Sequence, residues 1–322
     1  MTLPLVSVNI LAFNHRQYLA QCLDSVLAQT YAPLEITLVD NGSTDGAVEF
    51  VRQAYPQVRV IANDRNLGYS GGHNVGIRAT VGEYVLLLNP DVYLTPTFVA
   101  EAVRVLESAA DVGMVTGKLL LMDEAGNVTS RIDAAGTMID RYRRNYERGH
   151  GEDDVGQYER VEPVFAAFGA APLYRRAMLE DVQIAGEVFD QDLFTYREEV
   201  DLAWRAQARG WCCLYAPAAV AYHVHAYRPA SRRNCPPWQR RLQFRNRYLM
   251  VIKNDTAGNL LRHLPFLLAY ELAALGYVLL FEPELLKAYL EVLQLWPRMW
   301  RKRCWIQANR TIPAAALYHW FR

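Results

Sequence analysis

The sequence of 322 residues predicts an α/β fold, in which a mostly parallel central sheet is flanked by helices and followed by a basic helical extension. The first hundred residues alternate β-prone runs with helical stripes, which is typical of βαβ units and a parallel sheet. Residues 84–88 are wholly apolar, which predicts a strand buried on both faces. From residue 238 onward the pattern is helical and rich in arginine.

Four β-prone runs predict the strands of the first part, over residues 6–11, 36–39, 58–62 and 84–88. After the first strand, Leu19 and Leu23 share the apolar face of a helix expected over residues 18–29. A second helix is expected over residues 44–55, and a short one near 74–80 after a glycine-rich turn.

The middle of the chain is less regular. We expect a strand over residues 112–121, a turn over 123–127 and a mobile polar loop over 140–160. A strand of small residues over 164–174, a helix over 199–209 and a last strand over 211–220 are expected to follow.

The net charge of zero hides a split between two parts of the chain. Residues 1–227 carry 18 basic and 29 acidic side chains, a net charge of −11, whereas residues 228–322 carry 16 basic and 5 acidic ones, a net charge of +11. We therefore expect a main domain over 1–227 and a basic helical region over 228–322 that meets something anionic. By charge alone, nucleic acid and a membrane surface are both candidates.

The end of the chain favours the membrane. Residues 264–281 are nearly all apolar but contain Glu271, so we expect an interfacial or core helix rather than a membrane span. Farther on, basic residues interleave with Trp296, Trp300 and Trp305, which suits a lipid headgroup layer. We expect contact with the inner membrane surface and no nucleic acid. A helical hairpin packed on the body, or on a second copy in a homodimer, is the alternative.

The cysteines and the N-terminal residues give an indication of the cellular compartment. The five cysteines have no metal-binding spacing, and their odd, sparse count favours a reducing environment. The N-terminus lacks a basic stretch and a cleavage site, so we expect no signal peptide. The expected location is cytoplasmic and peripheral on the inner membrane face.

Two carboxylates follow strands that are expected to end at the same edge of the sheet. Pro90 cannot continue a ladder, so the strand before it must stop and present Asp91. This edge is where open α/β sheets bind ligands, and a lone carboxylate there suits a divalent cation on a diphosphate. Asp40 closes the second strand and could accept hydrogen bonds from a nucleobase or a ribose. The alternatives are a turn cap for Asp91 and an Asx-turn for Asp40.

Three further segments are candidates for chemistry. Residues 66–76 are dense in glycine, which would let backbone N–H groups approach a phosphate. The segment matches neither the dinucleotide fingerprint nor a P-loop, and a plain turn is the alternative. Glu198, Glu199 and Asp201 place three carboxylates close together. Such crowding raises the pKa of some of these carboxylates, as a general base requires. The alternative is an ordinary acidic helix start. His223 and His225 share one strand face and could bind a metal, or be simply solvated.

Taken in order, these motifs resemble glycosyltransferase family 2, whose enzymes have the GT-A (Rossmann-like) fold. The resemblance covers roughly residues 5–225. The segments that carry it are the opening strand ending in Asn14, Asp40-Asn41-Gly42-Ser43, Asn66-Leu67-Gly68 with Gly71-Gly72-His73-Asn74, Asn89-Pro90-Asp91 in the place of the family's DXD motif, and Glu198-Glu199-Val200-Asp201 followed by a histidine. The Asn-Pro-Asp form looks most like the rhamnosyltransferase-type and galactofuranosyltransferase-type branch.

The resemblance implies a role for each matching residue. Glu199 would be the catalytic base, and Asp91 with His223 would hold Mg²⁺ or Mn²⁺ on the sugar diphosphate. The donor nucleotide would be bound by Asn14, Asp40, Asn41, Asn66, Gly68, Gly72, Asn74 and Asn89. The sequence departs from the family in two places, because Asn89 replaces the first acid of DXD and because the base is Glu rather than Asp.

The implied reaction is inverting, metal-dependent sugar transfer in cell-surface polysaccharide synthesis. On branch resemblance the donor is expected to be dTDP-rhamnose, with UDP- and GDP-sugars open, and the acceptor a saccharide or a lipid-linked saccharide. The alternatives are a sugar-nucleotide nucleotidyltransferase, which would want a glycine-rich basic loop where Asn14-His15-Arg16 stands, and a non-catalytic nucleotide- or saccharide-binding protein of the same fold. The missing fingerprint disfavours an NAD-dependent oxidoreductase.

Overall fold

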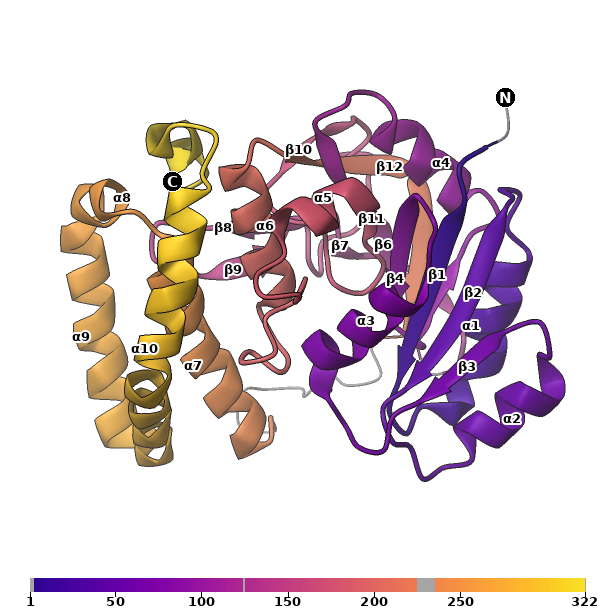
Figure 1. Cartoon of the computed structure of the whole chain (residues 1–322), viewed down its shortest axis with the longest axis horizontal. Coiled ribbons are helices and arrows are strands. Elements are labelled where there is room, and N and C mark those ends of the chain that lie inside the picture. The colour runs from indigo at the N-terminus through magenta and orange to yellow at the C-terminus, as the bar shows by residue number, and fades with distance from the viewer. Residues whose placement is uncertain (1–2, 124, 225–234, 322) are drawn as a thin grey trace.

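The computed structural model describes residues 3–123, 125–224 and 235–321, and within them the chain forms a 10-stranded mixed sheet (Figure 1). The strands lie in the order β10-β12-β6-β11-β4-β1-β2-β3, with β5 paired to β12 and β7 to β6. Their bounds are β1 Val6–Ala12, β2 Leu34–Asp40, β3 Arg59–Ala62, β4 Tyr84–Leu88, β5 Val92–Leu94, β6 Val112–Met122, β7 Val128–Ala134, β10 Glu162–Val164, β11 Leu173–Arg175 and β12 Cys212–His223; a separate hairpin pairs β8 Thr137–Ile139 with β9 Asn145–Glu147.

Helices cover both faces of the sheet. The α-helices are α1 Arg16–Leu27, α2 Ala47–Ala54, α3 Gly68–Ala79, α4 Phe98–Leu106, α5 Arg176–Val182, α6 Glu198–Ala208, α7 Pro237–Asn254, α8 Ala257–Arg262, α9 Leu264–Phe281 and α10 Leu286–Ala308, with 3₁₀ turns at η2 Pro283–Leu285 and η3 Ala314–Trp320. One core lies between the sheet and α1, α2 and α4, and a second lies between the sheet and α5 and α6. The helices α7 to α10 form a further layer beyond α6, at the end of the molecule away from β3 (Figure 1).

The parallel strands end together at one edge, as the sequence predicts. Strand β1 pairs in parallel with β2 and β4, so that Ala12 lies beside Asp40 and Ile10 beside Leu88. Leu88 and the rest of β4 are buried, since side chains of successive residues enter the two cores in turn. Asp40 and the Asn89–Asp91 segment therefore leave the sheet at the same edge.

The glycine-rich segment is helical, which corrects the expected turn. Helix α3 begins at Gly68 rather than near Asn74. A Cβ atom on Gly72 would lie 2.3 Å from a Leu11 methyl, and one on Gly76 would lie 3.1 Å from Asn9 and Val39. These glycines are there because they let the helix lie directly on β1 and β2.

Two other expectations about the middle of the chain are wrong. Residues 140–160 are held in place rather than mobile: they include β9, and Arg143 is wholly buried in an ion pair with Asp255 at 2.7 Å. Residues 164–174 are two short strands, β10 and β11, joined by a loop of buried alanines and phenylalanine. The small side chains allow this loop to pass close to the sheet edge.

Basic residues of the C-terminal helical region pair with acidic residues of the main domain. Lys253 lies on α7, wholly buried, and pairs with Asp190 and, at 2.9 Å, with Asp201. On α10, Lys302 pairs with Asp190 and, at 2.8 Å, with Asp192. The charge split therefore reflects complementarity between the helical layer and the body. The expected boundary at residues 227 and 228 lies outside the described residues.

Helix α9 is not a core helix. Of its side chains only Val278 is buried, and the outward residues are leucines and phenylalanines. Within residues 3–123, 125–224 and 235–321, this is the helix long and apolar enough, by length and composition, to cross a membrane. Glu271 is turned inward, where Arg247 on α7 pairs with it at 2.7 Å.

Candidate active site

Asp40 forms the Asx-turn, and one of its carboxylate oxygens has no hydrogen-bond partner among the described residues. Its Oδ2 atom accepts hydrogen bonds from the backbone N–H groups of Gly42, at 3.1 Å, and Ser43, at 2.9 Å, so the Asx-turn is present. The side chain is only 2% exposed, and its Oδ1 atom has no hydrogen-bond partner among the described residues. A buried carboxylate oxygen without a donor is costly, and it suits an N–H or O–H donor from a ligand.

The predicted donor-binding asparagines join the loops around Asp40. Asn14 Oδ1 accepts from the Thr44 N–H at 2.8 Å. Asn41 Nδ2 donates to the Gly68 carbonyl at 2.9 Å, and Asn66 Oδ1 accepts from the Gly68 N–H at 2.8 Å. These contacts fix the shape of the sheet edge where a nucleotide would lie.

Asp91 and His223 come together as the sequence suggested. Strand β5 pairs antiparallel with β12, which places Val92 beside His223. As a result, His223 Nε2 lies 3.5 Å from Asp91 Oδ1, and both side chains are buried. His225 lies outside the described residues.

This pair fits a divalent cation. An ion about 2.1 Å from each of two ligand atoms can join atoms that lie 3.5 Å apart. The described residues contain no group of three or more His, Cys, Asp and Glu side chains that could hold a metal. The remaining ligands would come from water and a diphosphate, which is how proteins usually bind Mg²⁺.

Asp133 is a site residue that the sequence analysis missed. It lies on β7, has 0% exposure, and its Oδ2 atom accepts a hydrogen bond from His223 Nδ1 at 2.7 Å. Burial lowers the pKa of His223, but the hydrogen bonds and charges of Asp133 and Asp91 outweigh it and raise the pKa to about 9. The contact spans 90 residues of sequence, and the motif order gives no signal for it.

Glu199 stands in the first turn of α6. Burial raises its pKa to about 7, the range in which a carboxylate can act as a general base near neutral pH. The adjacent Glu198 is buried, and burial together with the charge of Glu199 raises its pKa well above the ordinary value.

A short loop lies between Glu199 and His223. A Cβ atom on Gly169 would lie 3.8 Å from Glu199 Cγ, and the ring of the preceding Phe168 is 6.1 Å from that of His223. The next residue, Ala170, accepts a hydrogen bond from the Asn89 N–H at 2.9 Å. Glu199, His223 and the Asn89–Asp91 segment therefore surround one loop at the carboxyl edge of the sheet.

Three predicted donor-binding residues lie in different surroundings. The Asn74 side chain is buried and makes two hydrogen bonds to the backbone of Phe189, at 2.7 and 2.9 Å, so it is already used in the fold. Gly72 faces β1, as described above. Asn89 is half-buried beside Asp91.

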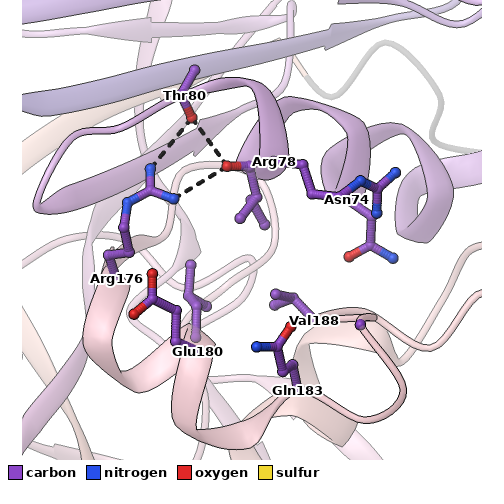
Figure 2. Close-up of a pocket in the computed structure, with 10 residues that line it drawn as sticks. Asn74, Arg78, Thr80, Arg176, Glu180, Gln183 and Val188 are labelled. Atoms are coloured by element: carbon purple, nitrogen blue, oxygen red, sulfur yellow. Dashed lines mark hydrogen bonds between the residues drawn. The ribbon is translucent and has the colours of Figure 1, made fainter.

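A cavity of about 270 Å³ lies elsewhere, between α3 and α5 (Figure 2). Helix α5 follows Arg175, which pairs with Tyr84 at the start of β4, so the cavity is at the amino edge of the parallel strands. Arg176 reaches across it and donates to the Ile77 carbonyl at 3.1 Å and to Thr80 Oγ1 at 3.4 Å (Figure 2). This arginine ties the end of α3 to α5, away from the residues that carry the chemistry.

The chain is similar in sequence to known glycosyltransferases. A model of the family described as Glycosyl transferase family 2 matches residues 7–183. The N-acetylglucosaminyl-diphospho-decaprenol L-rhamnosyltransferase of Mycobacterium tuberculosis is 30% identical over an alignment of 255 positions, which covers 70% of this chain and 76% of the relative. An uncharacterized glycosyltransferase of Haemophilus influenzae is 23% identical over 236 residues, 71% of this chain and 68% of the relative.

Solved structures of the same fold are more distant in sequence. The mannosyltransferase PcManGT from Pyrobaculum calidifontis, in complex with GDP-Man and Mn²⁺, has a TM-score of 0.56 at 20% identity, covering 98% of this chain and 79% of that one. GalNAc-T7, with UDP, GalNAc and Mn²⁺, has a TM-score of 0.58 at 15% identity, covering 78% of this chain and 48% of that one. This chain thus spans about half the length of GalNAc-T7. Both likenesses support the GT-A architecture predicted from the sequence.

Proposed function

The chain belongs to glycosyltransferase family 2, and on that premise we propose that it transfers rhamnose with inversion from dTDP-rhamnose to a lipid-linked saccharide of a cell-surface polymer. The name of the Mycobacterium tuberculosis relative, with its rhamnose and its diphospho-decaprenol acceptor, supports both substrates. The structural observation that carries the proposal is the Asp91–His223 pair, whose atoms lie 3.5 Å apart at the edge that also holds Glu199.

In the proposed reaction, Asp40 binds the nucleobase or ribose through its unpartnered Oδ1 atom. Asp91 and His223 would hold Mg²⁺ or Mn²⁺, which when bound would offset charge on the nucleoside diphosphate leaving group. Glu199 takes the proton of the acceptor hydroxyl as that oxygen attacks the anomeric carbon from the side opposite the diphosphate. The bond from the anomeric carbon to the diphosphate breaks, so the configuration inverts.

The test of this role is Glu199→Gln. Turnover of dTDP-rhamnose with a synthetic N-acetylglucosaminyl-diphospho-polyprenol should fall about 10²–10⁴-fold, because the base is lost. Binding of dTDP with Mn²⁺, measured by isothermal titration calorimetry, should stay near the wild-type value. Glu180→Gln, an exposed acid at the amino edge, is the matched control. Turnover that survives in Glu199→Gln would remove the assignment of the base.

The donor can be identified in the same experiment. Titration of the wild-type chain with dTDP, UDP and GDP, each with and without Mn²⁺, should give tightest binding for dTDP and a requirement for the cation. Tighter binding of GDP or UDP would replace rhamnose as the proposed sugar, and binding that ignores Mn²⁺ would exclude the Asp91–His223 pair as the cation site.

We further propose that α9 holds the enzyme on the cytoplasmic face of the inner membrane. A helix that is apolar all round needs an apolar environment on its outer side. Leu272 and Leu280 on that side are 70% and 76% exposed. Glu271 is turned inward, and Tyr248 and Arg247 of α7 bind its carboxylate. The outer surface therefore suits the acyl boundary of a bilayer, where a lipid-linked acceptor would also be found.

Vesicle co-sedimentation of the full chain tests this placement. Because much of the basic charge is paired internally, we expect binding that depends weakly on salt, and that is lost in the double variant Leu272→Glu/Leu280→Glu. Val155→Glu, which changes a side chain that is 82% exposed on the body, is the control and should bind like wild type. If the wild-type chain does not bind vesicles but forms a dimer, and the double variant is monomeric, this surface would instead contact a second copy of the chain.

A further inference from the structure

The turn that leads into Glu199 has an unusual backbone. Phe194, Tyr196 and Arg197 have φ angles of +65°, +74° and +72°. Large side chains rarely adopt this left-handed region, and each such residue costs on the order of 1 kcal/mol or more. Helix α6 begins directly after the turn, so the conformation of the turn sets the direction in which Glu199 points. A strained turn of this kind persists only where its surroundings hold it.

Asn246, on helix α7, provides the central support. Its side chain has 0% exposure, and its Nδ2 group lies 2.8 Å from the Leu193 carbonyl oxygen, 2.8 Å from that of Thr195 and 2.9 Å from that of Tyr196. The two N–H groups of one amide therefore serve three carbonyls of the turn, with one N–H shared between two of them. The neighbouring Arg245 adds a hydrogen bond of 2.7 Å to the Asp192 carbonyl.

The ends of the turn are held as well. The Arg197 guanidinium donates to the Gln243 carbonyl of α7 at 3.1 Å, and it also bonds to Asn145 Oδ1. On the opposite side, the Ser70 N–H of α3 donates to the Phe194 carbonyl at 3.1 Å. Gly68 makes this approach possible, since a Cβ atom there would lie 2.3 Å from the Phe194 oxygen. The turn is thus clamped between α7 and the helix that borders the predicted nucleotide site.

We propose that α7, through Asn246, positions Glu199 for proton transfer, so that Asn246 is a positioning residue of this enzyme. The inference rests on the proposed role of Glu199 as the base. If the clamp is removed, the peptide units before α6 can rotate and re-aim the carboxylate. A misplacement of about 1 Å can cost roughly 10²-fold in rate. The turn touches the predicted donor site at Gly68, which Asn41 and Asn66 also hold by hydrogen bonds, so donor binding should be unaffected.

The first test is Asn246→Ala in the full chain. We expect kcat with dTDP-rhamnose and the lipid-linked acceptor to fall about 10- to 100-fold, with KM for the donor and calorimetric binding of dTDP with Mn²⁺ near wild type. The kinetic pKa should also move downward, because a loosened turn admits water to the carboxylate.

The matched control is Asn259→Ala. Asn259 is a buried amide of α8, 2% exposed, that donates to Asp255 Oδ1 at 2.8 Å and does not touch the turn. Its loss should lower the melting temperature without lowering kcat. If Asn259→Ala reduces kcat as much as Asn246→Ala at an equal loss of melting temperature, the effect is one of stability and the positioning role is wrong.

A double-mutant cycle separates this inference from the proposed function. In a Glu199→Gln background, Asn246→Ala should cause no further loss of single-turnover rate, because the group it positions is gone. Losses that multiply would overturn the positioning role while leaving the base in place, and so would a normal kcat in Asn246→Ala alone. Full turnover in Glu199→Gln would instead overturn the proposed base, and the role of Asn246 with it.

Discussion

At the residue scale, two acids at the same sheet edge have opposite surroundings. Asp91 Oδ1 lies 3.5 Å from His223 Nε2, a polar partner with which it could hold a cation. Glu199 is half-buried, and the loss of hydration raises its pKa to about 7. Environments that differ in this way allow one carboxylate to bind a cation while the other exchanges a proton.

The raised pKa of Glu199 gives a pH dependence. The base acts only when deprotonated, so kcat should increase with pH up to about 7 and then level off. The measurement is kcat from pH 5.5 to 9 at saturating donor, acceptor and Mn²⁺. A profile that is flat between about pH 5.5 and 7 would mean that the group titrating in the reaction is not this carboxylate.

Asp133 should matter for metal binding. Its carboxylate accepts from His223 Nδ1 and so turns Nε2 toward Asp91. Replacing such an orienting carboxylate typically weakens metal affinity about 10–100-fold, and Asp133→Asn should do so here. The affinity can be measured by Mn²⁺ electron paramagnetic resonance in the presence of dTDP. Asp153→Asn, an exposed acid, is the control, and an unchanged Mn²⁺ affinity in Asp133→Asn would contradict the orienting role.

At the scale of the element, β12 carries His223 past an irregular stretch. Its register against β6 shifts between Ala216 and Val220, and the Ala219 carbonyl oxygen lies where a Cβ atom on Gly117 would be only 2.2 Å away. The missing side chain at Gly117 therefore lets the two strands meet at this irregularity.

Gly117→Ala should destabilise the fold. The added methyl meets backbone and the Phe98 ring, an overpacking that costs roughly 1–3 kcal/mol in the free energy of unfolding. Gly276→Ala in α9 has nothing within 4 Å and should instead stabilise its helix by about 0.5–1 kcal/mol. Urea denaturation measures both. Equal stabilities for the two variants would contradict the close approach of β6 and β12.

Local sequence patterns predict most of the helices and strands, whereas contacts between residues far apart in the sequence are not predicted. The strand before Asp91 was predicted because five successive apolar side chains announce burial on two faces. Asp133 and Asn246 were missed because their partners lie 90 and about 50 residues away in sequence. The start of α3 is predicted near Asn74 rather than at Gly68 because glycines that allow a helix to lie on a neighbouring strand resemble, in a sequence, the glycines of a turn.

At the scale of the whole molecule, the body and the helical layer are joined by buried charge. The charges of Lys253 and Lys302 and their hydrogen bonds outweigh burial and hold the pKa of Asp190 well below its ordinary value of 3.8. A group with a lowered pKa in the folded state stabilises the fold while it is ionised. Its contribution is therefore present at neutral pH and lost as the pH falls below about 4.

Lys253→Met tests this junction. The lysine is 0% exposed, and its removal takes one of two cationic partners from each of the buried carboxylates of Asp190 and Asp201. Breaking a buried pair from one side costs about 3–5 kcal/mol in the free energy of unfolding at pH 7. The variant should also lose less stability between pH 6 and 3 than wild type. Lys287→Met, an exposed change on α10, should leave both quantities unaltered; a similar loss there would show a general charge effect.

Three consecutive residues of α7 face in two directions. Asn246 holds the turn before Glu199, whereas Arg247 and Tyr248 bind Glu271 of the apolar helix. The helical layer is therefore structurally coupled to the turn before Glu199 and cannot be exchanged independently of it. A chimera that grafts this layer from another family member must bring residues 193–199 along with it, and natural recombination within the family would face the same constraint.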